Sequence, residues 1–184
     1  FWLLVVKPPQ SFIDAWGAAV TAPIHEEVGK GLVVLLVLLL FKQLNLKNAL
    51  VSGLIVGLSF QVVEDCVYTF QQMFTAKTDG FATLIERIVH AGGTHWTFSL
   101  VFAVGMVAIL SKNSGLSKKQ GWFWLSMAVL AHFLLNTPYN AGLTSDTAEV
   151  TILMLCFNLC LAIAAFMMVD KLEAHSKNRP VGRS

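Results

Sequence analysis

Groups of ionisable side chains interrupt the apolar stretches of this sequence at four separate places, and the last apolar stretch has only the amide Asn158. In order, these are the run 25–30 (HEEVGK), the pair Glu64 and Asp65, the single His95, and His132 with Asn136. A charged side chain costs about 2.5–3.5 kcal/mol at the centre of a transmembrane helix. Each of the four places is therefore a candidate functional site.

The spacing of these residues is helical. Four pairs lie four residues apart, about one helical turn: Glu26 and Lys30, Phe60 and Glu64, Glu64 and Tyr68, and His132 and Asn136. Residues four apart share a helix face, so each helix can turn its polar pair inward and its leucines toward lipid.

The residue types are those of an amide-bond hydrolase. A carboxylate can hold and deprotonate a water molecule, a histidine can bind a metal or act as an acid, and an asparagine amide can donate to an oxyanion. Three motifs of other enzyme classes are absent from the sequence. No serine lies in a GxSxG-type turn, and there is neither an HExxH motif nor a Gly-rich phosphate loop.

The composition indicates which elements must position these groups. Hydrophobic residues make up 55% of the 184 and charged residues 13%, and the mean hydropathy is +0.66. The charged share is about half that of a soluble domain. We therefore predict an all-α, polytopic transmembrane helix bundle with at least five spans. The predicted spans cover residues 15–41, 49–72, 83–110, 121–137 and 148–169.

Two local features refine the predicted helices. Pro23 either kinks the first span or marks its true start. Gly53 and Gly57 form a GxxxG pattern in the second span, which permits close helix packing.

The distribution of Lys and Arg predicts the orientation, because cytoplasmic loops are enriched in both. Two connections and the tail, which should share one side, hold nine of them: Lys42, Lys47, Lys112, Lys118, Lys119, Lys171, Lys177, Arg179 and Arg183. The other side has Lys7, Lys77 and Arg87. We expect a multi-pass protein of the cell membrane with a cytoplasmic C-terminus.

Three regions follow from this topology. Residues 1–10 are expected to be the end of an upstream span or a loop, 11–170 a single transmembrane catalytic domain, and 171–184 a basic cytoplasmic tail. The net charge of +2 is too small to indicate a nucleic-acid partner.

The topology also predicts the depth of the polar groups. At 1.5 Å per residue, Glu27 and His95 would lie about 18 Å from the outer ends of their spans, Glu64 about 12 Å and His132 about 8 Å. All four groups would then converge between the middle of the membrane and its extracytoplasmic surface.

Four motifs resemble those of a known family. Glu26-Glu27-x-x-Lys30 is similar to its first motif, Phe60-x-x-x-Glu64 with Tyr68 to its second, His95 to its third, and His132-x-x-x-Asn136 to its fourth. The sequence resembles the PrsW family of intramembrane proteases over about residues 23–140. That family lies within the superfamily of the type II CAAX prenyl proteases and bacteriocin-processing enzymes. Glu64, where the CAAX branch has His, resembles the PrsW branch.

The resemblance implies a set of roles. Glu26 and Glu27 would activate the attacking water, His95 and His132 would bind that water or a metal, and Asn136 would help to form the oxyanion hole. Lys30, Phe60, Glu64 and Tyr68 would support them. Glu64, His95 and His132 are the candidate ligands if a divalent metal such as zinc takes part, and otherwise no cofactor is expected.

The identity of the base is open between the two glutamates. Glu26 shares a helix face with Lys30, so it would be the ion-paired member and Glu27 the free base. The family convention instead takes the first glutamate as the base.

The resemblance also implies the reaction. PrsW proteins are similar to site-1 proteases, which cleave a single-span anti-sigma factor on its extracytoplasmic side. We expect an intramembrane endopeptidase of glutamic or metallo type, whose partners are the bilayer and a single-span membrane-protein substrate.

Other interpretations stay open. An ion or proton-coupled transporter would use the same buried acids, and a scaffold protein would need none of them for catalysis. Among single residues, Glu64 could form an ion pair with Lys30, each histidine could make an interhelical hydrogen bond, and Arg87 could be an interface anchor or a substrate-side charge.

Overall fold

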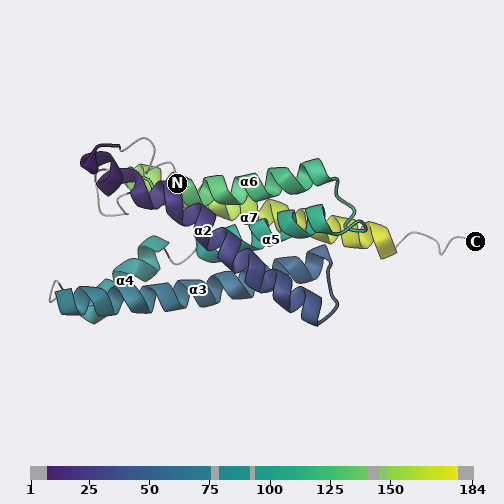
Figure 1. Ribbon diagram of the computed structural model, residues 1–184, viewed down its shortest axis with the longest axis horizontal. Helices are drawn as coiled ribbons and strands as arrows, with labels where there is room; N and C mark the ends of the chain where they lie inside the picture. Colours follow the sequence, from purple (N-terminus) through teal and green to yellow (C-terminus); the bar gives the residue numbers. More distant parts are fainter. Residues whose placement is uncertain (1–7, 76–78, 92–93, 141–145, 147, 178–184) are drawn as a thin grey trace, which may run out of the picture.

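The computed structural model describes residues 8–75, 79–91, 94–140, 146 and 148–177. These residues form six helices and no strand, which confirms the all-α prediction (Figure 1). The helices are α2 (Gln10–Leu40), α3 (Leu46–Thr75), α4 (Gly80–Ala91), α5 (His95–Leu110), α6 (Lys118–Leu135) and α7 (Ala148–Lys177). The predicted tail beyond residue 177 and the predicted upstream segment at 1–7 lie outside the described residues.

Two of the described helices are long and apolar enough to cross a membrane. These are α3 and, over Ala148–Ser176, α7, while α5 is apolar but shorter. Helices α2 and α6 both carry charged side chains within their length. Length and composition therefore do not confirm the expected five spans.

One predicted span is wrong. Residues 83–110 do not form one helix, because α4 ends at Ala91 and a separate helix, α5, begins at His95. The sequence carries Gly92 and Gly93 between them, and each glycine costs about 1 kcal/mol in a helix interior. His95 therefore starts a helix and does not lie 18 Å into one.

The other predicted spans match helices with shifted ends. Helix α2 begins five residues before the predicted span, so that Pro23 lies inside it and is not its start. Helix α7 continues to Lys177, beyond the predicted end of its span. A capping box formed by Ser117 and Gln120 begins α6, where the Ser117 hydroxyl accepts a hydrogen bond from the Gln120 backbone N–H.

Helix α5 is the centre of the bundle. Most of its residues are buried, and the consecutive buried run from Thr97 to Gly105 covers every side of the helix. A helix that is apolar around its whole circumference is buried on every face. Helices α3 and α6 pack directly on it.

Glycines allow these close contacts. A Cβ on Gly57 would lie 2.5 Å from Cα of Trp96 and 2.7 Å from the backbone oxygen of His95. A Cβ on Gly53 would lie 2.7 Å from Cα of Leu100. The GxxxG pattern thus brings the α3 and α5 backbones together, as predicted, and fixes where the first turn of α5 lies.

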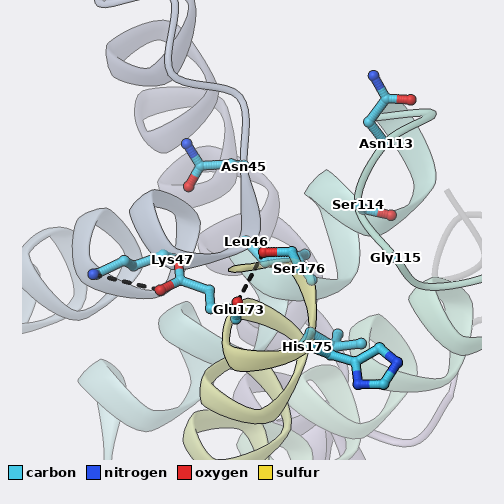
Figure 2. Close-up of a pocket in the computed structure, with 10 residues that line it drawn as sticks. Asn45, Leu46, Lys47, Asn113, Ser114, Gly115, Glu173, His175 and Ser176 are labelled. Atoms are coloured by element: carbon cyan, nitrogen blue, oxygen red, sulfur yellow. Dashed lines mark hydrogen bonds and ion pairs between the residues drawn. The ribbon is translucent and has the colours of Figure 1, made fainter. Parts of the chain in front are cut away.

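Three basic segments meet at one end of the bundle. The start of α3, the α5–α6 connection and the last turns of α7 line a common pocket of about 340 Å³ (Figure 2). Lys47 on α3 forms an ion pair of 3.5 Å with Glu173 on α7 at this pocket. The structure therefore brings together three segments that the sequence predicts on the same side of the membrane.

Candidate active site

Glu27 is the most buried acid of the site. It lies on α2 with no solvent-exposed surface. Its Oε1 atom is 2.5 Å from Nζ of Lys30 and 2.9 Å from Nδ1 of His132, and its Oε2 atom accepts a hydrogen bond of 3.3 Å from the Ser99 hydroxyl. Helices α2, α5 and α6 thus converge on this carboxylate. Such pairing is what a buried charge requires.

His95 has an equivalent acidic partner from another helix. Its Nε2 atom lies 3.2 Å from Oε2 of Glu64 on α3. The same Glu64 oxygen accepts a hydrogen bond of 3.1 Å from Nη2 of Arg87. On the opposite edge of the ring, Nδ1 of His95 lies 3.3 Å from Nζ of Lys30.

These contacts define the hydrogen positions on both rings. A carboxylate accepts hydrogen bonds, so the ring nitrogen that faces it must carry the hydrogen. His132 therefore donates from Nδ1 to Glu27, and His95 donates from Nε2 to Glu64. In neutral rings, this leaves an acceptor lone pair on Nε2 of His132 and on Nδ1 of His95.

Glu26 faces both lone pairs. Its Oε2 atom lies 3.7 Å from Nε2 of His132, 3.7 Å from Nδ1 of His95 and 3.8 Å from Nζ of Lys30. Neither Glu26 Oε2 nor His132 Nε2 has a hydrogen-bond partner among the described residues, although both atoms are buried. Two of these three acceptor atoms, Glu26 Oε2 and His132 Nε2, therefore still require a donor or a cation among the described residues, whereas Nδ1 of His95 can accept a hydrogen bond from the Lys30 ammonium.

The paired glutamates differ from one expectation. The shorter ion pair of Lys30 is with Glu27, three residues before it, and not with Glu26, four residues before it. Glu26, with about 23% of its side chain exposed, is the member with an oxygen that has no hydrogen-bond partner among the residues described.

The convergent atoms fit a divalent metal. One ligand atom each from Glu26, His95 and His132 lies within 4.8 Å of the others, and neighbouring ligands of a tetrahedral zinc ion lie about 3.3–3.6 Å apart. Each histidine also donates its second ring nitrogen to a carboxylate, which is the usual arrangement of metal-binding histidines. The resemblance had implied Glu64 as the carboxylate ligand. Glu64 instead contacts Nε2 of His95, so the carboxylate of the candidate metal group is that of Glu26.

Aromatic rings enclose the two histidines. The ring of Phe98 stacks on His132, with centroids 4.7 Å apart and an interplanar angle of 12°. Nζ of Lys30 lies 4.5 Å from the ring centroid of Phe60. The ring centroids of Phe60 and His95 are 5.2 Å apart. These contacts restrict the orientation of both imidazoles.

A comparison with protein families decides what this arrangement belongs to. A family model described as PrsW family intramembrane metalloprotease matches residues 1–168 of the 184. The chain belongs to the PrsW family. No curated protein and no solved structure shows significant similarity to it.

Family membership agrees with the apolar helices. PrsW proteins are intramembrane proteases by their family description, and α3 and α7 are apolar enough to cross a bilayer. The chain is therefore a membrane protein of a protease family.

Two residues expected in the PrsW site lie at its edge. Asn136 follows the last residue of α6 as its C-cap, and its backbone N–H donates to the carbonyl of His132 at 3.2 Å. Within the described chain, its side chain has no recorded hydrogen bond to the clustered acids and histidines. Tyr68 is 43% exposed, and its ring centroid lies 4.2 Å from Cζ of Arg87, which in turn contacts Glu64.

The structure adds partners that the sequence did not reveal. Ser99 lies one helical turn after His95, a spacing that could have indicated a shared face. Asp65 accepts hydrogen bonds from Gln61 and Arg87. The pairing of Arg87 with Glu64 and Asp65 had no signal in the sequence, because it joins two helices.

A groove leads from the bundle surface to Glu26. It lies between α2 and α3 and has a volume of about 510 Å³. Its lining is mainly apolar and includes His25, Glu26, Gly29, Lys30, Val33, Val56, Ser59, Phe60 and Val63. Glu26 and Lys30 thus belong both to the buried cluster and to a surface that a substrate can reach.

Proposed function

We propose that this protein is an endopeptidase that hydrolyses a peptide bond of a single-span membrane protein, and that Glu26, His95 and His132 hold the attacking water. The observation that carries the proposal is a pair of buried atoms, Glu26 Oε2 and His132 Nε2, that have no hydrogen-bond partner in the part of the chain that the structure describes. A water molecule or a divalent ion between them would satisfy both.

The proposed hydrolysis begins with Glu26. Its carboxylate removes a proton from water as the water oxygen attacks the carbonyl carbon of the scissile amide. Asn136 is the proposed donor to the resulting oxyanion, for which its side chain must turn toward the substrate. Glu26 then returns the proton to the amide nitrogen, the C–N bond breaks, and a carboxylic acid and an amine are released, which exchange a proton to give a carboxylate and an ammonium group.

The remaining residues hold Glu26, His95 and His132 in their orientations. Glu27 holds His132 by Nδ1, and Glu64 holds His95 by Nε2, so the opposite nitrogen of each ring faces Glu26. Lys30 balances the charge of Glu27 in a buried setting. Phe60 and Tyr68 are proposed to act through Lys30 and Arg87, whose cations lie over their rings.

The family description favours a metal in the same place. Glu26, His95 and His132 would hold a divalent ion such as zinc, which would polarise the scissile carbonyl and activate the water. The second-nitrogen contacts to Glu27 and Glu64 would then orient the two ligand rings.

The groove between α2 and α3 suits a membrane-protein substrate. Its walls are apolar, and its floor includes Glu26. We propose that the substrate segment enters here, in a single catalytic domain over 11–170 with at least five spans and a cytoplasmic C-terminus. The cleavage would lie toward the extracytoplasmic side, as in the cleavage of an anti-sigma-factor-like protein.

Labelling of new protein termini in isolated membranes tests the proposal without a known substrate. Membranes that contain the wild-type chain should release fragments whose new N-termini lie next to single transmembrane segments. Membranes with Glu26→Gln at equal abundance should lack these termini. Identical terminus sets in the two samples would reject the protease function.

A further inference from the structure

Arg87 joins α4 to α3 through three contacts. Its Nε atom lies 2.8 Å from Oδ1 of Asp65, and its Nη2 atom lies 3.1 Å from Oε2 of Glu64. Its Cζ atom lies 4.2 Å from the ring centroid of Tyr68. The guanidinium thus uses two donors for two neighbouring carboxylates and one face for an aromatic ring, a combination that lysine cannot reproduce.

One of these carboxylates also contacts the candidate active site. Oε2 of Glu64 accepts from Arg87 and lies 3.2 Å from Nε2 of His95. Arg87 and His95 therefore donate to the same oxygen from two helices. The other edge of the His95 ring faces Lys30 and Glu26.

We propose that Arg87 is a positioning residue that acts through Glu64 on His95, an inference that rests on the proposed function. By holding the Glu64 carboxylate against Nε2, Arg87 keeps the hydrogen of His95 on Nε2 and the lone pair of Nδ1 toward Glu26. Without Arg87, Glu64 is free to turn away, and the His95 hydrogen can move to Nδ1. The ring would then present a donor where the site needs an acceptor.

Asp65 separates this role from simple attachment of α4 to α3. It is buried, binds Arg87, and is also bound by Nε2 of Gln61 at 3.1 Å. Asp65 makes no hydrogen bond or ion pair with His95 among the described residues. Removing its charge therefore weakens the link between the helices and leaves the Glu64–His95 contact in place.

The first experiment observes the ring directly. Nitrogen NMR of ¹⁵N-histidine-labelled protein in detergent reports which nitrogen of His95 carries the hydrogen, with His95→Gln used to assign its signals. The wild type and Asp65→Asn should show the Nε2–H form, and Arg87→Gln should show a substantial Nδ1–H population. An unchanged Nε2–H form in Arg87→Gln would overturn the proposal, whether or not the protein cleaves a substrate.

The second experiment is a double-mutant cycle on cleavage. Arg87→Gln and Glu64→Gln should each lower kcat by about 10- to 100-fold with little change in KM. This is the usual effect of removing a residue that orients an active-site histidine by a hydrogen bond. The double variant should be no slower than the slower single one. Arg87→Lys should recover part of kcat, and Asp65→Asn should keep it within about threefold while it lowers stability.

Two kinetic results would contradict the proposal. If Asp65→Asn lost as much kcat as Arg87→Gln, the role of Arg87 would be only to attach α4 to α3. If the Arg87 and Glu64 effects multiplied, Arg87 would not act through Glu64. If the wild type cleaved nothing, the proposed function would fail, and the NMR result would still decide the role of Arg87.

Discussion

Nε2 of His132 lies 3.7 Å from Oε2 of Glu26, and both atoms are buried without a hydrogen-bond partner in the described part of the chain. Two acceptors at this separation repel each other unless a donor or a cation lies between them. Nδ1 of His95, also 3.7 Å from the Glu26 oxygen, completes the group. The proposed chemistry depends on this relationship.

The first prediction is that these three residues bind a divalent ion. Purified wild-type protein should bind about one zinc ion per chain, measured by metal analysis after dialysis. His95→Ala and His132→Ala should each reduce the bound zinc strongly, because each removes one of three ligands. The control is His175→Ala, which alters a histidine of the pocket at the basic end (Figure 2). Loss of zinc in the control, or retention in His132→Ala, would argue against this site.

The second prediction concerns the buried ion pair of Glu27 and Lys30. Glu27→Gln should destabilise the protein by up to about 3–5 kcal/mol, because it removes the nearer counter-charge of a buried ammonium and leaves Glu26 at 3.8 Å. Unfolding in mixed detergent micelles measures this change. Glu27→Gln combined with Lys30→Met should recover part of the loss.

The matched control for this pair is the exposed one. Glu173→Gln breaks the ion pair with Lys47, whose side chain is 60% exposed, and should cost less than about 1 kcal/mol. Equal losses for the two glutamate variants would contradict the importance of the buried pair.

The third prediction tests how α3 positions His95. Gly57→Ala places a Cβ 2.7 Å from the backbone oxygen of His95, so the helices must separate. The expected cost is about 1–3 kcal/mol, accompanied by a fall in cleavage, because the first turn of α5 shifts.

Gly29→Ala is the control for the glycine variant. A Cβ on Gly29 meets nothing within 4 Å. Alanine should therefore be neutral or should stabilise α2 by up to about 1 kcal/mol. Comparable destabilisation by both variants, in the same unfolding assay, would show that the close α3–α5 contact is not the cause.

The fourth prediction concerns orientation. In a variant without Cys66, Cys156 and Cys160, a membrane-impermeant thiol reagent should label Asp146→Cys in intact cells. Lys112→Cys should be labelled only after the membrane is opened, because the basic segments are predicted to be cytoplasmic. The reverse pattern would place the cleavage on the other side of the membrane.

The convergence of the clusters was predictable from the sequence. Buried ionisable groups on separate apolar helices must pair with one another, and Glu26, Glu27, His95 and His132 do lie together. The helix-forming stretches were also evident, because their apolar length is the dominant signal in such a chain.

Contacts between helices were not predictable in detail. Lys30 can reach Glu26 or Glu27 from the same face, and the choice depends on His132 and Ser99, which come from α6 and α5. Similarly, the contact of Arg87 with Glu64 depends on where α4 ends and α5 begins.

Helix spacing does not predict the direction of one side chain. Asn136 is the C-cap of α6, and its backbone N–H still donates to the carbonyl of His132 four residues earlier, so the helical interval holds at the backbone. Among the described residues, the Asn136 side chain has no hydrogen bond to the clustered acids and histidines. The proposed oxyanion contact therefore has to form with substrate.

The central claim is tested most directly by the rate at which purified protein in detergent cleaves a single-span substrate found by terminus labelling. Wild type is compared with Glu26→Gln, which keeps the shape of the side chain and removes its charge. We predict that Glu26→Gln lowers the rate by at least about 100-fold, with unchanged unfolding. Cleavage by Glu26→Gln at the wild-type rate would contradict the account.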